Sequence, residues 1–402
     1  TAWSTKTPDV LTGWNTKFFD VPYLVNRFRK ILGEDEAKKM SPWNFISERK
    51  TVINGRAMTA YGFLGVEQLD YIELYKWYAP GGKSQESYRL DNIANVEIGE
   101  SKISYDEYDN LHQLYRLNFQ KFIEYNIVDV DLVVAMDEKL KFIDLCRAIC
   151  HAGYVPYEDY IYSSKWLEGA CLSYLKNKGL VATNKPKDRK ERMQALRDND
   201  EEKFIGAYVK DPIVGKHDWI YDLDLTSLYP SIIMTLNISP ETKIAKIEDW
   251  DVQKFMKREV DYYQMGENRI SRDNLEKYIK EGDFTISSNG VLYRKDKMGC
   301  IPEILDIWFN ERVEFRKLEK KYGQEGDKEK YAFYGKRQLV QKILLNSLYG
   351  VLGLPAFRFY DVDNAEAVTT TGQTVIKNSA NMGNIKYNKE LGTKDVDSNI
   401  KT

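Results

Sequence analysis

The sequence predicts a multidomain protein of mixed α/β and α+β class. Its 402 residues suffice for two to four domains, each with a hydrophobic core of its own. Polar and apolar residues alternate with a period of two over 219–225, which is typical of a strand, and a helix-opening turn follows. The helical periodicity of 301–322, and of the segment that begins near Lys328, predicts two long helices. A hydrophobic content of 43% and an aromatic content of 13% agree with a globular chain rather than a disordered one.

The strand over 219–225 carries two carboxylates close to its end. Asp222 and Asp224 are two positions apart, so they project from the same face of the strand. Ser227 can cap the helix that follows, and Pro230 would lie in its first turn, where a missing N–H costs nothing. A carboxylate in this position can hold a metal ion against a triphosphate. The alternative is a buried strand whose Asp merely caps a helix.

A second candidate cluster lies on the helix that begins near Lys328. Lys342, Asn346, Tyr349 and Gly350 fall at positions i, i+4, i+7 and i+8, so they share one stripe, while the apolar residues between them point elsewhere. This stripe offers a phosphate clamp, a hydrogen-bonding amide and a stacking surface, and the glycine leaves room for the close approach of a base pair. The alternative is an ordinary amphipathic helix with a solvated lysine.

Two further patterns lie in the first third of the chain. Residues 9–14 are expected to form a strand, and the amphipathic helix after it is expected to be capped by Asp20, with Pro22 in its first turn. Tyr125 and Asp129 are four positions apart and would share one helical face. From the residues alone, Asp20 is interpreted as a cap and Tyr125 as a helix-surface residue.

Other segments give the order of the remaining elements. A long amphipathic helix is expected over 130–152. The charged stretch 176–203 is nearly free of aromatic residues and is either a mobile linker or a solvated helix. Asn289 and Gly290, between two short apolar runs, predict a β-hairpin. The turn between the two long helices is expected at 323–327.

Charge and cysteine content exclude several classes of function. The net charge is −2, so a nucleic-acid-binding chain of this composition must segregate basic grooves from acidic sites. The four cysteines form no C-x-x-C pair, which indicates a reducing compartment without a disulfide framework. Cys146, Cys150 and His151 cluster at helical spacing, and we interpret them as buried thiols rather than a zinc site. No apolar run is long enough to span a bilayer.

The two motifs together resemble two characteristic blocks of the family B DNA polymerases. Residues 224–233 match the D-x-x-S-L-Y-P-S-I-I block, and residues 342–350 match the K-x-x-x-N-S-x-Y-G block, in the same order. Four other segments narrow the resemblance to the replicative polymerases of T-even-like bacteriophages: 11–15, 206–213, 288–293 and 357–361. The resemblance therefore extends from near the first residue to about Gln373.

The resemblance implies the architecture of a right-hand polymerase preceded by a proofreading domain. Residues 1–145 would be a partial, ribonuclease H-like 3′-5′ exonuclease domain, and 146–205 a connecting segment similar to the family's N-terminal domain. The palm would begin at 206–285. The helical-hairpin fingers would follow at 286–353, and the second, truncated part of the palm at 354–402.

By the same resemblance, the polymerase site would contain a metal centre and a triphosphate clamp. Asp224 and the backbone carbonyl of Leu225 would bind the metal ions. The triphosphate would contact the backbone amides of Ser227 and Leu228 and the side chains of Arg312, Arg316 and Lys342. The family pattern has lysine at position 316, and arginine keeps the charge but changes the geometry.

The resemblance also assigns residues to the sugar, the base pair and the template. Tyr229 would pack under the sugar and exclude a 2′-hydroxyl, and Asn346 would line the nucleotide pocket. Tyr349 and Gly350 would test the shape of the new base pair. Gly206 opens a segment that contacts template DNA in the family.

For the proofreading site, the resemblance implies catalytic roles for three residues. Asp20 and Asp129 would bind metal ions, and Tyr125 would help to place the attacking water. Each of the two active sites would use two Mg²⁺ ions, and Mn²⁺ can substitute for them.

Two blocks of the family are not found in this sequence. The strand-borne D-x-E pair would precede Asp20, and the G-D-T-D-S hairpin would follow the helical hairpin. The sequence of residues 395–398 is similar to that of the G-D-T-D-S block, but the neighbouring residues lack an apolar strand pattern. We therefore expect an internal fragment of a longer polymerase, or one half of a split enzyme, with both active sites incomplete.

The leading hypothesis is a template-directed DNA polymerase with an associated 3′-5′ exonuclease, inactive or weakly active as an isolated chain. Its expected partners are primer-template DNA, deoxynucleoside triphosphates, a second polypeptide that completes the sites, and a sliding clamp with other replisome proteins bound through other regions. The expected location is the cytoplasm, in the host cell if the source is viral, without membrane association. The alternatives are a DNA-binding module without activity and a nuclease in which only the N-terminal site works.

Overall fold

The chain forms two compact units, Thr1–Tyr162 and Ser163–Thr402. Each unit has its own sheets and its own core, so each is described by itself. The computed structural model describes residues 2–53, 55–79, 85–185, 188, 191, 206–211, 214–216, 223–282 and 284–392.

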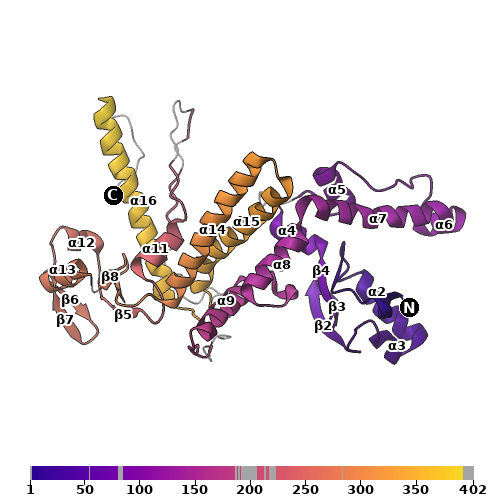
Figure 1. The fold of residues 1–402 in the computed structure, drawn as a ribbon, viewed down its shortest axis with the longest axis horizontal. Helices are drawn as coiled ribbons and strands as arrows, with labels where there is room; N and C mark the ends of the chain where they lie inside the picture. The colour runs from indigo at the N-terminus through magenta and orange to yellow at the C-terminus, as the bar shows by residue number, and fades with distance from the viewer. Residues whose placement is uncertain are drawn as a thin grey trace. The chain divides into compact units, whose positions relative to one another are not determined.

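The first unit combines two small sheets with a set of helices (Figure 1). Its strands are β1 (Val10–Gly13), β2 (Ile46–Ile53), β3 (Arg56–Phe63) and β4 (Glu67–Asp70). Its helices are α1 (Ala2–Thr5), α2 (Asp20–Leu32), α3 (Glu34–Lys38), α4 (Tyr71–Tyr78), α5 (Leu90–Ile98), α6 (Leu111–Leu117), α7 (Phe119–Leu140), α8 (Phe142–Gly153) and the 3-10 helix η1 (Tyr157–Asp159). Strand β1 pairs in parallel with β4, and β2 pairs antiparallel with β3. The strand expected at 9–14 is thus confirmed as β1.

The core of the first unit has two parts. One lies between α2 and the β2–β3 hairpin, where Val21 and Val25 pack against Tyr61 and Phe63. The other gathers apolar side chains of β4, α4, α5, α7 and α8, which include the fully buried Tyr71 and Met136. Burying large apolar side chains is the main source of stability in such a unit.

The two cysteines of α8 belong to this second core. Cys146 and Cys150 are buried, and the neighbouring Cys150 thiol together with burial raises the pKa of Cys146. A thiol that stays protonated is a poor metal ligand. Among the described residues, no group of three or more His, Cys, Asp or Glu side chains is arranged to hold a metal ion. The expectation that Cys146 and Cys150 are buried thiols is confirmed by their burial.

Helix boundaries in this unit differ from the predictions at two places. The helix expected over 130–152 is two helices, because Lys141 between α7 and α8 has a left-handed backbone, with φ 57°. The break is stabilised locally, since the Asp137 side chain accepts the Ile143 N–H of α8 at 3.2 Å. Asp20 is the first residue of α2, whereas Phe19 occupies the cap position, and no side-chain hydrogen bond caps this helix. The predicted cap at Asp20 is therefore wrong.

The second unit is mainly helical, with two small antiparallel sheets (Figure 1). Its helices are α9 (Ser163–Asn177), α11 (Leu228–Leu236), α12 (Val252–Met256), α13 (Arg272–Glu281), α14 (Cys300–Glu325), α15 (Lys328–Leu352) and α16 (Val362–Leu391). Its strands are β5 (Lys243–Lys246), β6 (Tyr262–Met265), β7 (Asn268–Ser271), β8 (Phe284–Ile286) and β9 (Val291–Arg294). Strand β9 lies between β5 and β8, and β6 pairs with β7.

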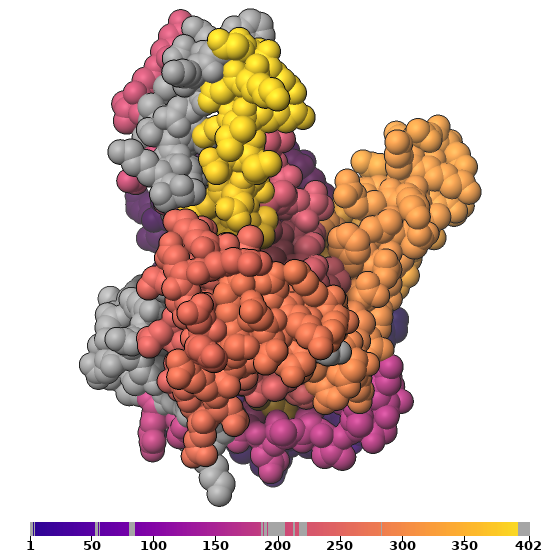
Figure 2. Space-filling model, turned by 90° about the vertical axis from the view of Figure 1, so that its left-hand side faces the viewer, coloured from indigo at the N-terminus to yellow at the C-terminus, as the bar shows by residue number. Residues whose placement is uncertain are grey.

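Both predicted hairpins of this unit are present. Strands β8 and β9 pair antiparallel around a turn in which Gly290 has φ 83°, a conformation that favours glycine. Helix α15 begins at Lys328 as predicted, and the Asp327 side chain caps it by accepting the Lys330 N–H at 3.0 Å. Helix α14 runs on to Glu325, so the turn is shorter than expected. In Figure 2 the far end of this helical hairpin, in orange, stands clear of α16, in yellow.

Helix α11 is central to the packing of the helices in the second unit, because it contacts α14, α15 and α16. Ile232 and Ile233 of α11 are buried, and so are Leu344 and Leu348 of α15. The start of α16 is tied to β5 by ion pairs from Lys243 to Asp361 and Asp363, at 3.0 and 2.7 Å.

Some predictions fall on residues that the structure does not describe. Most of the strand expected at 219–225, with Asp222, lies outside the described residues, and 223–225 are not in a strand. Much of 176–203 and all of 395–398 also lie outside them. Within the described residues, no helix combines the length and apolar character that crossing a membrane requires.

Candidate active sites

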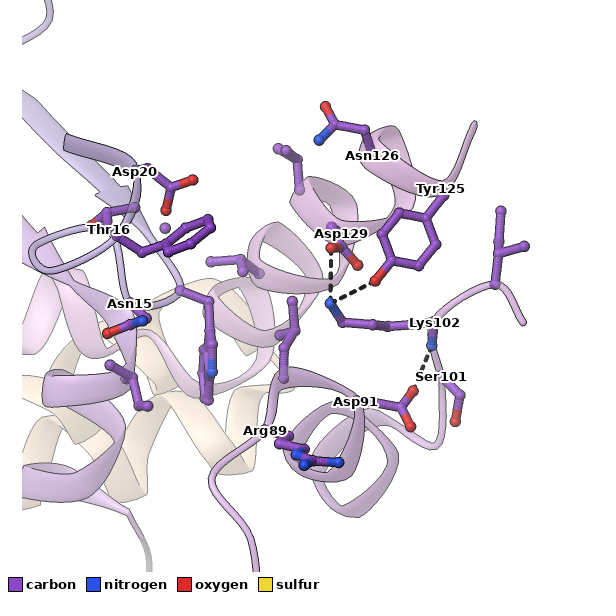
Figure 3. Close-up of a pocket in the computed structure, with 18 of the residues that line it drawn as sticks. Asn15, Thr16, Asp20, Arg89, Asp91, Ser101, Lys102, Tyr125, Asn126 and Asp129 are labelled. Atoms are coloured by element: carbon purple, nitrogen blue, oxygen red, sulfur yellow. Dashed lines mark hydrogen bonds and ion pairs between the residues drawn. The ribbon is translucent and has the colours of Figure 1, made fainter. Parts of the chain in front are cut away.

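The first unit contains a large open cavity, of about 1190 Å³. Asp20 from the start of α2 lines it, as do Tyr125 and Asp129 from α7. Figure 3 shows Asp20 on one side and Asp129 with Tyr125 on the other. The three residues that the sequence suggested for one site therefore line one cavity, although more than a hundred positions separate the first from the others.

A buried carboxylate holds the loop that leads to Asp20. Asp70, at the end of β4, accepts backbone N–H groups from Asn15 at 2.8 Å, Lys17 at 3.0 Å and Ile72 at 3.3 Å. Burial raises the pKa of Asp70 to about 6, although these three N–H donors oppose the increase. Since one oxygen binds Asn15 and the other binds Lys17, the carboxylate fixes the turn between β1 and α2.

Figure 3 shows the Lys102 ammonium next to Asp129 and Tyr125 of α7. This ammonium donates to Asp129 Oδ2 at 2.8 Å and to the Tyr125 hydroxyl at 3.3 Å. Burial lowers the pKa of Lys102, but the hydrogen bond to Asp129 and the attraction of its charge outweigh that effect, so the net change is upward. Lys102 lies in the irregular segment after α5. Its backbone N–H donates to Asp91 Oδ1 of α5 at 2.7 Å, which anchors this segment. The position of this lysine could not be predicted from the sequence, because it lies outside any periodic element.

The carboxylates of this cavity fit a divalent cation in part. Asp129 Oδ1 is buried and has no hydrogen-bond partner among the described residues. Burial raises the pKa of Asp20, although a backbone hydrogen bond opposes the increase, and a nearby cation would favour its ionised form. Oxygen donors are the ligands that Mg²⁺ prefers. Asp91 and Asp106 also line the cavity, but no three acidic, His or Cys side chains among the described residues are arranged to hold a metal ion.

The second unit contains a smaller cavity, of about 500 Å³. Residues 224–230 line one part of it, with Asp224 and Leu225 at the start of this segment. The other lining residues come from the helical hairpin: Arg312 and Arg316 of α14, and Lys342 and Asn346 of α15. Asp224 and Lys342, which are distant in the sequence, therefore line the same cavity.

Positive charge dominates the second cavity. Arg312, Arg316 and Lys342 line it together with one acidic side chain, Asp224. Arg312 Nε is buried and has no hydrogen-bond partner among the described residues. Burial lowers the pKa of Arg312, and the nearby Arg316 lowers it further. A buried guanidinium N–H beside like charges is stabilised by an anion with several oxygen atoms, such as a phosphate.

The first turn of α11 forms part of the cavity wall. Ser227 occupies the cap position in a left-handed conformation, with φ 54°, and its side chain makes no capping hydrogen bond. The predicted cap is therefore wrong, although Pro230 lies in the first turn as expected. Helix N-termini favour anions, because their first N–H groups lack partners within the helix.

The remaining predicted residues lie near this cavity or at the surface. The rings of Tyr229 and Tyr349 contact each other, with centroids 4.5 Å apart, and burial raises the pKa of Tyr349. Gly350 is exposed, and a Cβ added there would meet nothing within 4 Å. The Gly206 carbonyl accepts a hydrogen bond from Gln373 of α16 at 2.7 Å.

Comparison with known proteins gives two family matches. The model described as DNA polymerase family B matches residues 162–400, and the model for the exonuclease domain of DNA polymerase family B matches residues 1–93. The two matches correspond in order to the two units of the chain.

Individual relatives agree with the family matches. The chain is 30% identical to the DNA-directed DNA polymerase of Escherichia phage RB69, over 97% of this chain and 45% of the relative. It is 30% identical to that of Enterobacteria phage T4, over 98% of this chain and 46% of the relative. Identity to DNA polymerase 2 of Aeropyrum pernix is 26%, over 92% of this chain and 40% of the relative.

These relatives are longer proteins, and the chain spans less than half of the length of each. The family B polymerase model alone covers more than half of the chain, from residue 162 to residue 400. With its exonuclease and polymerase regions of mixed α/β structure, the chain belongs to DNA polymerase family B.

Proposed function

We propose that this chain supplies the nucleotide-binding part of a template-directed DNA polymerase and part of its 3′-5′ proofreading site. One observation carries the proposal: Asp224, Arg312, Arg316 and Lys342 line a single cavity. One carboxylate facing three cations suits a metal-bound triphosphate, since the cations match the phosphate oxygens and the carboxylate matches a metal ion.

The proposed architecture follows the family. Residues 1–145 form a partial ribonuclease H-like exonuclease domain, and 146–205 connect it to the polymerase. Residues 206–285 and 354–402 contribute to the palm. The fingers are 286–353, an assignment supported by the antiparallel α14–α15 hairpin that brings Arg312 and Lys342 to the same cavity.

In the polymerase site, the side chains of the hairpin bind and orient the triphosphate. Arg312 and Arg316 offer planar guanidinium groups for paired hydrogen bonds, and Lys342 offers a compact charge. The amides of Ser227 and Leu228 at the start of α11 would bind further phosphate oxygens. Holding the nucleotide in line with the primer end is the larger part of catalysis in phosphoryl transfer.

The metal site of the polymerase centre would use oxygen donors from 224–225. The Asp224 carboxylate and the Leu225 carbonyl would hold Mg²⁺, or Mn²⁺ in its place, and when bound the ions neutralise phosphate charge and lower the pKa of the primer hydroxyl.

Selection of the nucleotide falls to the residues around Tyr229. The Tyr229 ring packs under the sugar and excludes a 2′-hydroxyl. Asn346, Tyr349 and Gly350 contact the new base pair from its minor-groove side, and the missing side chain at position 350 leaves that approach open. Gly206 contacts the template strand. These contacts read shape rather than sequence.

In the proofreading site, Asp20 and Asp129 would hold the metal ions that activate a water molecule. The Tyr125 hydroxyl would orient that water, and Lys102 holds the hydroxyl and Asp129 together through its two hydrogen bonds. The partners of the whole enzyme are primer-template DNA, deoxynucleoside triphosphates and, through other regions, a sliding clamp with other replisome proteins. A second polypeptide could complete both sites.

A primer-extension assay tests this function. The chain is assayed alone and together with a polypeptide that carries the remaining part of the polymerase region of a phage relative. We expect extension by the mixture, loss of extension on Asp224→Ala, and DNA affinity that changes by no more than a few fold. Normal extension by Asp224→Ala contradicts the proposal. For Asp20→Ala and Asp129→Ala, the expected result is loss of 3′-end trimming with synthesis retained.

A further inference from the structure

Residues of two helices lie close to the ring of Tyr229. One is Tyr349 of α15, with ring centroids 4.5 Å apart. The other is Gly372 of α16, where an added Cβ would lie 2.9 Å from Tyr229 Cε1 and 3.5 Å from its Cδ1. A carbon-carbon contact of 2.9 Å is shorter than packed atoms accept. The close approach of α16 to the ring therefore requires glycine at position 372.

A glycine at this position is unfavourable for the helix itself. Gly372 is buried in the interior of a helix that runs from Val362 to Leu391, and glycine destabilises a helix interior relative to alanine. A second glycine of the same helix, Gly383, would place a Cβ in open space. An alanine would therefore meet the Tyr229 ring at position 372, whereas at position 383 it would meet no other side chain.

Helix α16 is fixed on both sides of Gly372, so it cannot easily move away from the ring. The Thr371 hydroxyl accepts the Ser288 N–H at 3.0 Å, and Gln373 donates to the Gly206 carbonyl at 2.7 Å. Lys243 holds the start of the helix through Asp361. A side chain at position 372 would therefore displace the Tyr229 ring rather than the helix, and Tyr349 limits the space into which the ring can retreat.

We propose that Gly372 is a positioning residue that fixes the Tyr229 ring and so determines how strongly the site prefers a deoxyribose over a ribose. The inference rests on the proposed nucleotide pocket, in which Tyr229 faces the sugar. Gly372 itself does not line the cavity, whereas Tyr229 does. A methyl group at position 372 moves the ring and changes the distance between it and the sugar, while the phosphate-binding side chains of the hairpin stay in place.

The test measures nucleotide binding by the full chain with Gly372→Ala. Dissociation constants for dATP and ATP are determined by titration calorimetry with Mg²⁺ and a primer-template whose 3′ end is blocked. The wild type is expected to bind dATP more tightly, and Gly372→Ala is expected to change the ratio of the two constants by at least about threefold. Gly383→Ala is the matched control, because it makes the same change in the same helix without a contact, and the ratio should stay at the wild-type value.

A second background separates ring positioning from a general effect on folding. In Tyr229→Leu the aromatic ring is gone, so Gly372→Ala should change the ratio no further. If Gly372→Ala alone does not fold, the double variant with Tyr229→Leu should fold, since the conflict is with that ring.

The outcomes distinguish the two levels of inference. A wild-type ratio in folded Gly372→Ala, or an effect that persists in the Tyr229→Leu background, overturns the role of Gly372 and leaves the nucleotide site standing. A double variant that does not fold also overturns it. Absence of any nucleotide binding by the wild type overturns the proposed function, and with it this inference.

Discussion

Asp70 shows how one buried carboxylate fixes the turn between β1 and α2 and also contributes to the pH dependence of stability. Its pKa in the folded protein is raised to about 6 from an ordinary value of 3.8, because burial disfavours the charged form. The folded state therefore holds its proton more tightly than the unfolded state. The stability that this group contributes is complete below about pH 4 and is lost as the pH rises through about 6.

We therefore predict that the free energy of unfolding of the wild type, relative to Asp70→Asn, falls between pH 4 and pH 7. The decrease should be no more than about 3 kcal/mol. Asparagine does not titrate, and its amide places a donor against the N–H groups of the loop, so the variant adds a constant loss. Urea unfolding at several pH values measures the difference. A difference that is constant across this range would contradict the raised pKa.

Lys102 gives a second prediction for a single residue. Lys102→Met leaves Asp129 half-buried without its cation, and we expect a loss of about 1–3 kcal/mol in the free energy of unfolding. Lys39→Met is the matched control, since it breaks a pair with Glu36 that is exposed on both sides. Exposed pairs contribute about 0–1 kcal/mol. Equal losses in the two variants would show that the Lys102–Asp129 pair stabilises the protein no more than an exposed ion pair does.

For residues on periodic elements, the family resemblance indicated which side chains come together, and their catalytic roles stay predictions. Asp20, Tyr125 and Asp129 line one cavity, as the family pattern suggested. Lys102 lies in an irregular segment without a periodic pattern, and the Asp70 contact joins residues that are 55 positions apart. Neither contact could be read from spacing, because both depend on how separate segments pack.

Helix α16 is held at its start by both a side-chain cap and an ion pair. Asp361 accepts the Asn364 N–H at 3.1 Å as a cap and also binds Lys243. We predict that Asp361→Ala lowers the free energy of unfolding by about 1–3 kcal/mol, because both the cap and the ion pair are lost.

The control for this prediction is Asp251→Ala, which removes a cap from the short α12. Since neither cap bond of Asp251 involves a lysine side chain, the expected loss is about 1 kcal/mol. Thermal unfolding of the three proteins gives the comparison. A smaller effect for Asp361 than for Asp251 would mean that the Lys243 pair does not stabilise α16.

The elements themselves were predicted with different success. The α14–α15 hairpin and the β8–β9 hairpin follow from periodicity and turn residues, which are local signals. The break at Lys141 was missed, because a left-handed lysine carries no turn signal of its own. The cap at Ser227 was wrong, since the serine is in a left-handed conformation from which its side chain does not reach the helix.

The whole molecule has a net charge of −2, yet three cationic side chains line one of its cavities. Local charge, not the total, determines whether a polyanion binds. Composition predicted only that charge must be segregated. The residues that gather the positive charge were identified through the family resemblance, because no periodic pattern connects 224–230 with the helical hairpin.

The central claim is that Asp224 and Lys342 belong to one triphosphate site. Titration of the full chain with Mg²⁺ and dATP, with wild type beside Lys342→Ala, tests it most directly. Loss of a charged hydrogen bond costs about 1.5–3 kcal/mol, so affinity should fall by about tenfold or more. Lys330→Ala, on the same helix but paired with Asp327 outside the cavity, should bind like the wild type. Equal affinities for wild type and Lys342→Ala would contradict the claim.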